Sequence, residues 1–181
     1  RVHGSVISVP PGFTQDAAFE AIENGVKLIV IVTENIPRQE VAQMVELASL
    51  RGARIVGPNC LGRRWPGEAK IGGLGGRAVD ARKAFTKGRV GVMSRSGGMT
   101  TEICNTLSAA GLGQSTAVGI GGDPVKGTEF IDVLDMFLAD PDTHAIIMIG
   151  EIGGQAEEDA AEFIKREAAK GRKKPMAGFI A

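Results

Sequence analysis

The chain has 181 residues, of which 43% are hydrophobic, and its 21 basic residues balance 21 acidic ones. This length and composition predict one large or two small globular domains with a buried core. Balanced charge provides no broad electrostatic field for nucleic acid or an anionic membrane, so any anion must be bound locally.

Targeting and redox features predict a soluble intracellular protein. No apolar run reaches the roughly 20 residues of a membrane span, and the N-terminus lacks the layout of a secretory signal. The two cysteines, Cys60 and Cys104, have no spacing for a metal site and fit a reducing compartment. We therefore expect no metal site, and a cytoplasmic location or an organelle reached through a removed transit peptide.

The first third of the chain alternates predicted strands with predicted helices. Apolar runs predict strands at residues 5–9, 26–32 and 53–56, and helical spacing predicts helices over 14–24 and from Pro37 to Gly52. The second strand is almost continuously apolar, as in a strand that is buried on both faces. This alternation is the repeating unit of a doubly wound parallel sheet.

A second α/β unit is predicted over residues 88–181. Periodicity is lost between residues 63 and 87, where Gly, Arg, Pro and Lys dominate, and we expect a linker there after a first unit over 1–62. Beyond it, the expected strands are residues 89–93, 115–120, 145–149 and 175–180, and the expected helices are 98–110, 128–138 and 155–170.

Three Gly-rich turns follow predicted strands of this second unit. They are Ser94–Gly98, Gly119–Asp123 and Gly150–Gly154, and each precedes a helix-like stretch. A parallel sheet would bring all three to the carboxyl ends of its strands, where open α/β folds bind ligands. Turns with so few side chains favour anion binding by backbone amides and helix N-termini.

Each turn also has a purely structural interpretation. Ser96 could simply cap the helix that follows it. Glu151 could hold a histidine in one orientation, or it could be a surface carboxylate near a helix start. The turn Gly119–Asp123 could merely redirect the chain before Pro124.

Other polar strand ends and the histidines are less informative. Thr33–Pro37 and Gly57–Cys60 could hydrogen-bond a nucleotide or cap loops. His3 lies at the start of the chain and His144 enters a strand at the edge opposite the Gly-rich turns, so neither is expected to be catalytic. The sequence contains no Ser-His-Asp arrangement, zinc motif or Walker loop, so a nucleophile or base must come from elsewhere.

Seven motifs occur in the order and close to the spacing of a known family. They are Thr33–Pro37, Gly57–Cys60, Pro66–Gly72, Ser94–Gly97, Gly113–Thr116, Gly119–Pro124 and Gly150–Gly154. Over nearly the whole chain they resemble the α subunits of succinyl-CoA synthetase, within the superfamily of NDP-forming acyl-CoA synthetases and ATP-citrate lyase. The resemblance implies the second part of a Rossmann-like CoA-binding domain, followed by a flavodoxin-like parallel-sheet ligase domain.

The resemblance also implies a reaction and a partner. In that family a β subunit of the ATP-grasp type binds ATP or GTP with Mg²⁺. The γ-phosphate passes to a small carboxylate by way of a phosphohistidine and an acyl phosphate. CoA then attacks the acyl carbon and phosphate leaves, or the steps run in reverse. The implied location is the cytoplasm, or the mitochondrial matrix in a eukaryote.

Site residues follow from their positions in the motifs. The resemblance places CoA beside Thr33, Glu34 and Asn59. It implies that the phosphohistidine or the substrate carboxylate is cradled by Ser94, Ser96, Gly97 and Gly98. The acyl substrate would contact Thr100 or Thr101, and Glu151 would orient the histidine.

The chain departs from the family in three respects. The Gly-rich CoA loop would precede Arg1 and the phosphorylated histidine would follow Ala181, so we expect a fragment that is inactive alone. The run Ser96–Met99 is nearer to ATP-citrate lyase, and Leu61–Trp65 replaces a usually small, apolar segment. The carboxylic acid substrate is therefore left open between succinate, citrate and malate. A further alternative is a non-catalytic CoA-binding module.

Overall fold

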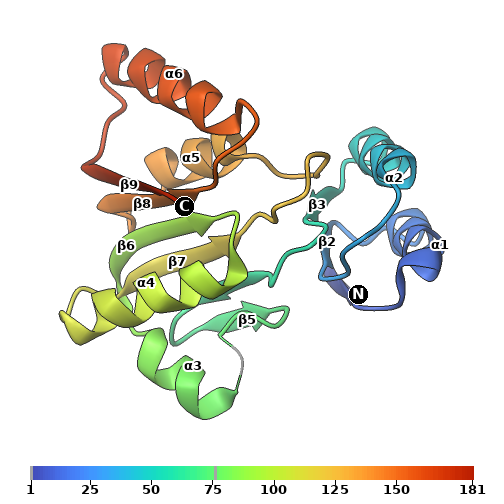
Figure 1. The fold of residues 1–181 in the computed structure, drawn as a ribbon, viewed down its shortest axis with the longest axis horizontal. Coiled ribbons are helices and arrows are strands. Elements are labelled where there is room, and N and C mark those ends of the chain that lie inside the picture. The colour runs from blue at the N-terminus through green and yellow to red at the C-terminus, as the bar shows by residue number, and fades with distance from the viewer. Residues whose placement is uncertain (1, 76) are drawn as a thin grey trace.

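A small parallel sheet forms the first unit of the computed structural model, which describes residues 2–75 and 77–181 (Figure 1). Its strands pair in the order β1-β2-β3. They alternate with two helices in the sequence β1 (Gly4–Ile7), α1 (Pro11–Glu23), β2 (Leu28–Ile31), α2 (Arg38–Leu50) and β3 (Arg54–Val56). The predicted alternation of strands and helices is therefore confirmed here.

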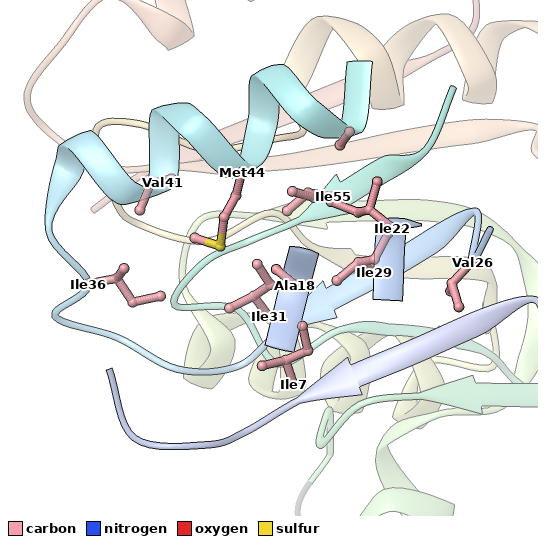
Figure 2. Packing of buried hydrophobic residues seen from close by; sticks show 11 residues of the cluster. Ile7, Ala18, Ile22, Val26, Ile29, Ile31, Ile36, Val41, Met44 and Ile55 are labelled. Carbon is pink, nitrogen blue, oxygen red and sulfur yellow. The ribbon is translucent and has the colours of Figure 1, made fainter. Parts of the chain in front are cut away.

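The period-two pattern of β2 divides its side chains between two clusters. Ile29 and Ile31 are fully buried with Ala18 and Ile22 of α1 and Met44 of α2, as Figure 2 shows. Alternate β2 residues point to opposite faces, so Val30 enters a second cluster with residues of the chain beyond β3. Burial on both faces explains why this strand is almost continuously apolar.

A six-stranded sheet forms the second unit, with the strand order β5-β4-β7-β6-β8-β9. Strands β7, β6, β8 and β9 are parallel. This part of the chain contains β4 (Arg63–Trp65), β5 (Ala69–Ile71), α3 (Ala78–Ala84), β6 (Lys87–Ser94), α4 (Gly97–Ala109), β7 (Gln114–Gly119), α5 (Phe130–Ala139), β8 (Ala145–Gly150), α6 (Ala156–Ala169) and β9 (Met176–Ile180). The order second-first-third-fourth among the parallel strands is the flavodoxin-like order, so the expected fold class is confirmed.

Helices cover both faces of this sheet. On one face, α5 and α6 pack over β6 and β8 through Phe130, Phe137 and Phe163. On the other face, α3 and α4 pack through Phe85 and Leu107. The resulting three layers leave the ends of the parallel strands at the surface, and their carboxyl ends face the first unit (Figure 1).

The expected linker over residues 63–87 is corrected by the structure. β4 and β5 form an antiparallel hairpin, and β4 also pairs antiparallel with β7 of the second sheet. The side chains of β4 are only partly buried, and β5 lies at the sheet edge. Each strand of this hairpin has only three residues and none of them is fully buried, so neither strand is long or apolar enough to show a period-two pattern in the sequence.

No helix within residues 2–75 and 77–181 has the length and apolar character needed to cross a membrane.

Glu167 links α6 to the following loop and should make stability depend on pH. Its side chain is 4% exposed and accepts hydrogen bonds from Lys170 at 2.8 Å and from Arg172. The hydrogen bond from Lys170, followed by that from Arg172, lowers the pKa of the Glu167 carboxyl. A lowered folded-state pKa means that the stabilisation is complete above the unfolded value of roughly 4.3 and is lost as pH falls through the folded pKa.

We therefore expect Glu167→Gln to lower the melting temperature at pH 7 and to lower it progressively less between pH 4.5 and pH 3. Glu162→Gln is the matched control on the same helix, because the Glu162–Lys165 pair has side chains that are 70% and 72% exposed. The measurement is thermal unfolding of the two variants and the parent chain across this range. A Glu167→Gln difference that stays constant with pH would contradict the assignment.

Candidate functional site

The three Gly-rich turns meet at one rim of the second sheet. Ser94 at the end of β6 pairs with Gly119 at the end of β7 and with Ile149 of β8. Strand order reverses between β6 and β8, and a flavodoxin-like sheet binds its ligand at such a switch point. Ser96 and Glu151, from the turns after β6 and β8, line one cavity of about 460 Å³.

The turn after β6 is held by its own hydroxyls. The Ser94 side chain is buried, donates to the Ser96 carbonyl at 2.9 Å and accepts from the Ser96 N–H at 3.0 Å. Ser96 is the N-cap of α4 and its hydroxyl accepts from the Met99 N–H at 3.4 Å. The N–H groups of Gly97 and Gly98 then remain as first-turn donors that have no partner within the helix, a geometry suited to an anion.

Arg95 connects this turn to the other two. Its Nη2 donates to the Gly122 carbonyl at 3.2 Å, and its Nη1 donates to the Gly153 carbonyl at 3.1 Å and to Glu157 Oε1 at 3.1 Å. The Arg95 side chain is only 11% exposed. Sequence analysis did not single out Arg95 or Glu157, although Arg95 is the one charged residue in the turn Ser94–Gly98.

Glu151 presents its carboxylate to the cavity. Its backbone N–H donates to Glu157 Oε1 at 3.0 Å, and its Oε2 lies 3.8 Å from Arg95 Nε. Gly122 of the neighbouring turn lies next to this carboxylate, since a Cβ at Gly122 would be 3.6 Å from the same Oε2, an ordinary contact. Within the described part of the chain the carboxylate oxygens accept no hydrogen bond, which leaves them available to a donor on a bound group.

Asn59 completes the rim from the first unit. Its side-chain amide donates to Asp123 at 3.0 Å, and its backbone N–H donates to the Thr33 carbonyl at 2.9 Å. Asn59 has a positive φ of 52° and lines the cavity with the turns after β6, β7 and β8. The site therefore includes residues from both sheets.

The apolar part of the cavity lining is formed by Val32, Cys60 and Leu61. Leu61 packs on the α4 N-terminus, because a Cβ at Gly97 would lie 2.4 Å from Leu61 Cδ1. Burial raises the pKa of the Cys60 thiol to about 12, so this thiol is protonated at neutral pH and is no nucleophile there.

Five predicted site residues do not line the cavity. Thr33 donates to the Val9 carbonyl at 2.7 Å, and Glu34 points into solvent from the same loop. Three hydroxyls are engaged with nearby backbone, those of the buried Ser94 and Thr100 and that of Thr101. The structure thus gathers Asn59, Ser96, Gly97, Gly98 and Glu151, and the roles of the other five stay predictions.

His144 lies away from this rim. Its Nε2 is 2.8 Å from Arg89 Nη1, and its N–H donates to the Arg89 carbonyl immediately before β8 begins. His144 therefore lies at the amino end of β8, whereas Glu151 follows the carboxyl end of the same strand, so the His144 imidazole is not near Glu151.

Two family models match the chain. Residues 93–181 match the CoA-ligase family and residues 1–35 match the CoA binding domain. The solved structure of ATP citrate lyase from Methanothrix soehngenii, in complex with citrate and coenzyme A, has a TM-score of 0.89 at 24% identity. That match covers 99% of this chain and 29% of the other, and it supports the fold. Fold and rim together define an α/β protein of the CoA-ligase class.

The curated relatives identify the family within this class. Subunit alpha 1 of the ADP-forming succinate–CoA ligase from Archaeoglobus fulgidus is 49% identical over 98% of this chain and 57% of its own length. The corresponding α subunit from Aquifex aeolicus is 47% identical over 98% of this chain and 55% of its own. The chain belongs to this family of succinate–CoA ligase α subunits, and it spans a little over half of the length of these relatives.

Proposed function

We propose that the chain is part of an α-type subunit of a ligase that converts succinate, CoA and ATP or GTP into succinyl-CoA, nucleoside diphosphate and phosphate. The observation that carries the proposal is the shared cavity, which the N-terminal residues of α4 line together with Glu151. In such a cavity, backbone amides can bind an anionic group while the carboxylate accepts a hydrogen bond from an imidazole N–H. The complete subunit would supply the histidine.

Each predicted residue has a proposed place in this scheme. The N–H groups of Gly97 and Gly98 would donate hydrogen bonds to the phosphoryl or carboxylate oxygens. Ser96, the N-cap of α4, and the buried Ser94 would hold the turn in position. Thr100 or Thr101 is proposed to face the acyl substrate. Glu151 would accept a hydrogen bond from the imidazole and fix its tautomer.

CoA is proposed to lie on the carboxyl-edge loops of the first unit, beside Thr33, Glu34 and Asn59. These loops fit a ligand because they are at the edge where doubly wound sheets bind nucleotides, and Asn59 already lines the cavity. When bound, CoA would supply the thiol nucleophile. The nucleotide and Mg²⁺ are proposed to bind an ATP-grasp β subunit, and the described residues of this chain hold no cluster of metal-ligating side chains.

Two alternatives remain. The sequence Ser96–Met99 favours a citrate-using subunit as the second candidate, because it resembles ATP-citrate lyase beside the proposed carboxylate site. A non-catalytic CoA-binding module is less favoured, since such a module does not need a cavity that the α4 N-terminus and Glu151 line together.

The test is a substrate panel with the full-length subunit and its partner. Succinate, citrate and malate are each supplied with CoA and with ATP or GTP, and thioester formation and nucleoside diphosphate release are measured. We expect succinate to give the highest kcat/KM. A preference for citrate would replace succinate by the second candidate. No thioester with any acid, together with no phosphorylation of the subunit by labelled ATP, would reject the ligase function.

A further inference from the structure

Arg95 makes contacts that join three separate turns of the site. Its own backbone belongs to the turn after β6, its Nη2 binds the Gly122 carbonyl after β7, and its Nη1 binds the Gly153 carbonyl after β8. A guanidinium presents several donors in one rigid plane, so one side chain can fix carbonyls that approach from different directions. Lysine, with one ammonium on a flexible stem, cannot hold this arrangement.

Arg95 and Glu157 together fix the backbone of Glu151. Arg95 Nη1 lies 3.4 Å from the Glu151 carbonyl and 3.1 Å from Glu157 Oε1. The same Oε1 accepts from the Glu151 N–H at 3.0 Å. The peptide groups on both sides of the Glu151 Cα are therefore tied to one ion pair, whose side chains are only 11% and 12% exposed.

One donor of Arg95 is left without a hydrogen-bond partner. Its Nε is buried and has none in the described structure, and the nearest carboxylate atom is Glu151 Oε2 at 3.8 Å. This distance is too long for a hydrogen bond but lies within the range of an ion pair. A buried donor beside a carboxylate that accepts no hydrogen bond indicates a pair arranged for a function, since native structures rarely leave such donors unpaired.

We propose that Arg95 is the positioning residue for Glu151. It holds the turn after β8 in register with the α4 N-terminus, and it keeps a positive charge beside the carboxylate that receives the imidazole. This inference rests on the proposed function, because it assigns Arg95 a part in the same histidine phosphorylation. Arg95 is not itself a group that exchanges protons with the reacting atoms.

The test compares Arg95→Lys and Arg95→Met in the complete subunit with its partner. We expect phosphorylation by labelled ATP to slow about 100-fold in both variants, because a displacement near 1 Å can cost that much. The KM for ATP should change little, since the nucleotide binds the partner. Arg166→Lys is the control, because it makes the same substitution at a side chain that is 61% exposed on α6.

The rate constant at saturating ATP separates positioning from a structural role. The backbone of Glu151 is tied on both sides to Arg95 and Glu157, so loss of the Arg95 guanidinium should lower the rate constant of each folded active site. A variant that is merely less folded should instead lose active sites in proportion to its unfolded fraction, and each remaining site should react at the parent rate.

A second variant guards against misfolding. Arg95→Met leaves the Glu157 carboxylate buried and unpaired, so Arg95→Met with Glu157→Gln is also made, and its melting temperature and rate are measured. A folded double variant that remains slow at saturating ATP supports the inference. Parent-like rates in Arg95→Lys, or losses of rate that only follow the unfolded fraction of each variant, would overturn it. A parent enzyme that is not phosphorylated at all would instead reject the proposed function.

Discussion

Replacing Glu151 by glutamine in the complete subunit should slow phosphorylation of the histidine by ATP by about 10²- to 10⁴-fold. Glutamine keeps the size of the side chain but replaces a charged acceptor by a neutral amide that can donate as well as accept. An imidazole that loses its acceptor can adopt the wrong tautomer or orientation. The expected effect is on the rate constant, measured by rapid quench with labelled ATP.

The fold should tolerate this substitution, because the Glu151 side chain is 35% exposed and its carboxylate accepts no hydrogen bond in the described part of the chain. Glu158→Gln is the matched control, since Glu158 is an exposed carboxylate in the first turn of α6. We expect the control to phosphorylate at the parent rate. Phosphorylation of Glu151→Gln at that same rate would remove Glu151 from the mechanism.

Sequence periodicity was sufficient to predict the parallel strands of both sheets, because the central ones are buried. β2 and β8 are short apolar runs flanked by helices whose inward-facing residues recur at helical spacing. Parallel pairing then places the residues after β6 and β8 on the same edge by topology alone. This is why Ser96 and Glu151, 55 residues apart in sequence, could be predicted to share a site.

Long-range contacts could not be predicted in the same way. β4 has the sequence Arg63-Arg64-Trp65, and its pairing with β7 depends on residues more than 50 positions away. The bonds of Arg95 to Gly122 and Gly153 span 27 and 58 residues, and no local pattern encodes them. Even the local orientation of the Thr100 side chain could not be predicted. Its hydroxyl donates to the carbonyl four residues earlier instead of lining the cavity.

Replacing Gly121 by alanine should destabilise the chain by at least about 3 kcal/mol. Gly121 has φ of +92°, a conformation that an L residue adopts only with strain. A Cβ there would also lie 2.1 Å from the Pro58 carbonyl oxygen, which belongs to the first unit. A backbone atom cannot move aside as a flexible side chain can, so the clash should separate the turn after β7 from the loop that holds Asn59.

Gly122→Ala is the control at the neighbouring position. Its Cβ would meet Glu151 Oε2 at 3.6 Å, an ordinary contact, and Gly122 has no positive φ. We expect a change in the free energy of unfolding of less than about 1 kcal/mol for this variant, measured by urea denaturation. Equal stability of the two variants would mean that the chain can re-form the contact between Gly121 and Pro58 in another geometry. The contact between Gly121 and Pro58 would then not be needed to keep Asn59 and Glu151 in the same cavity.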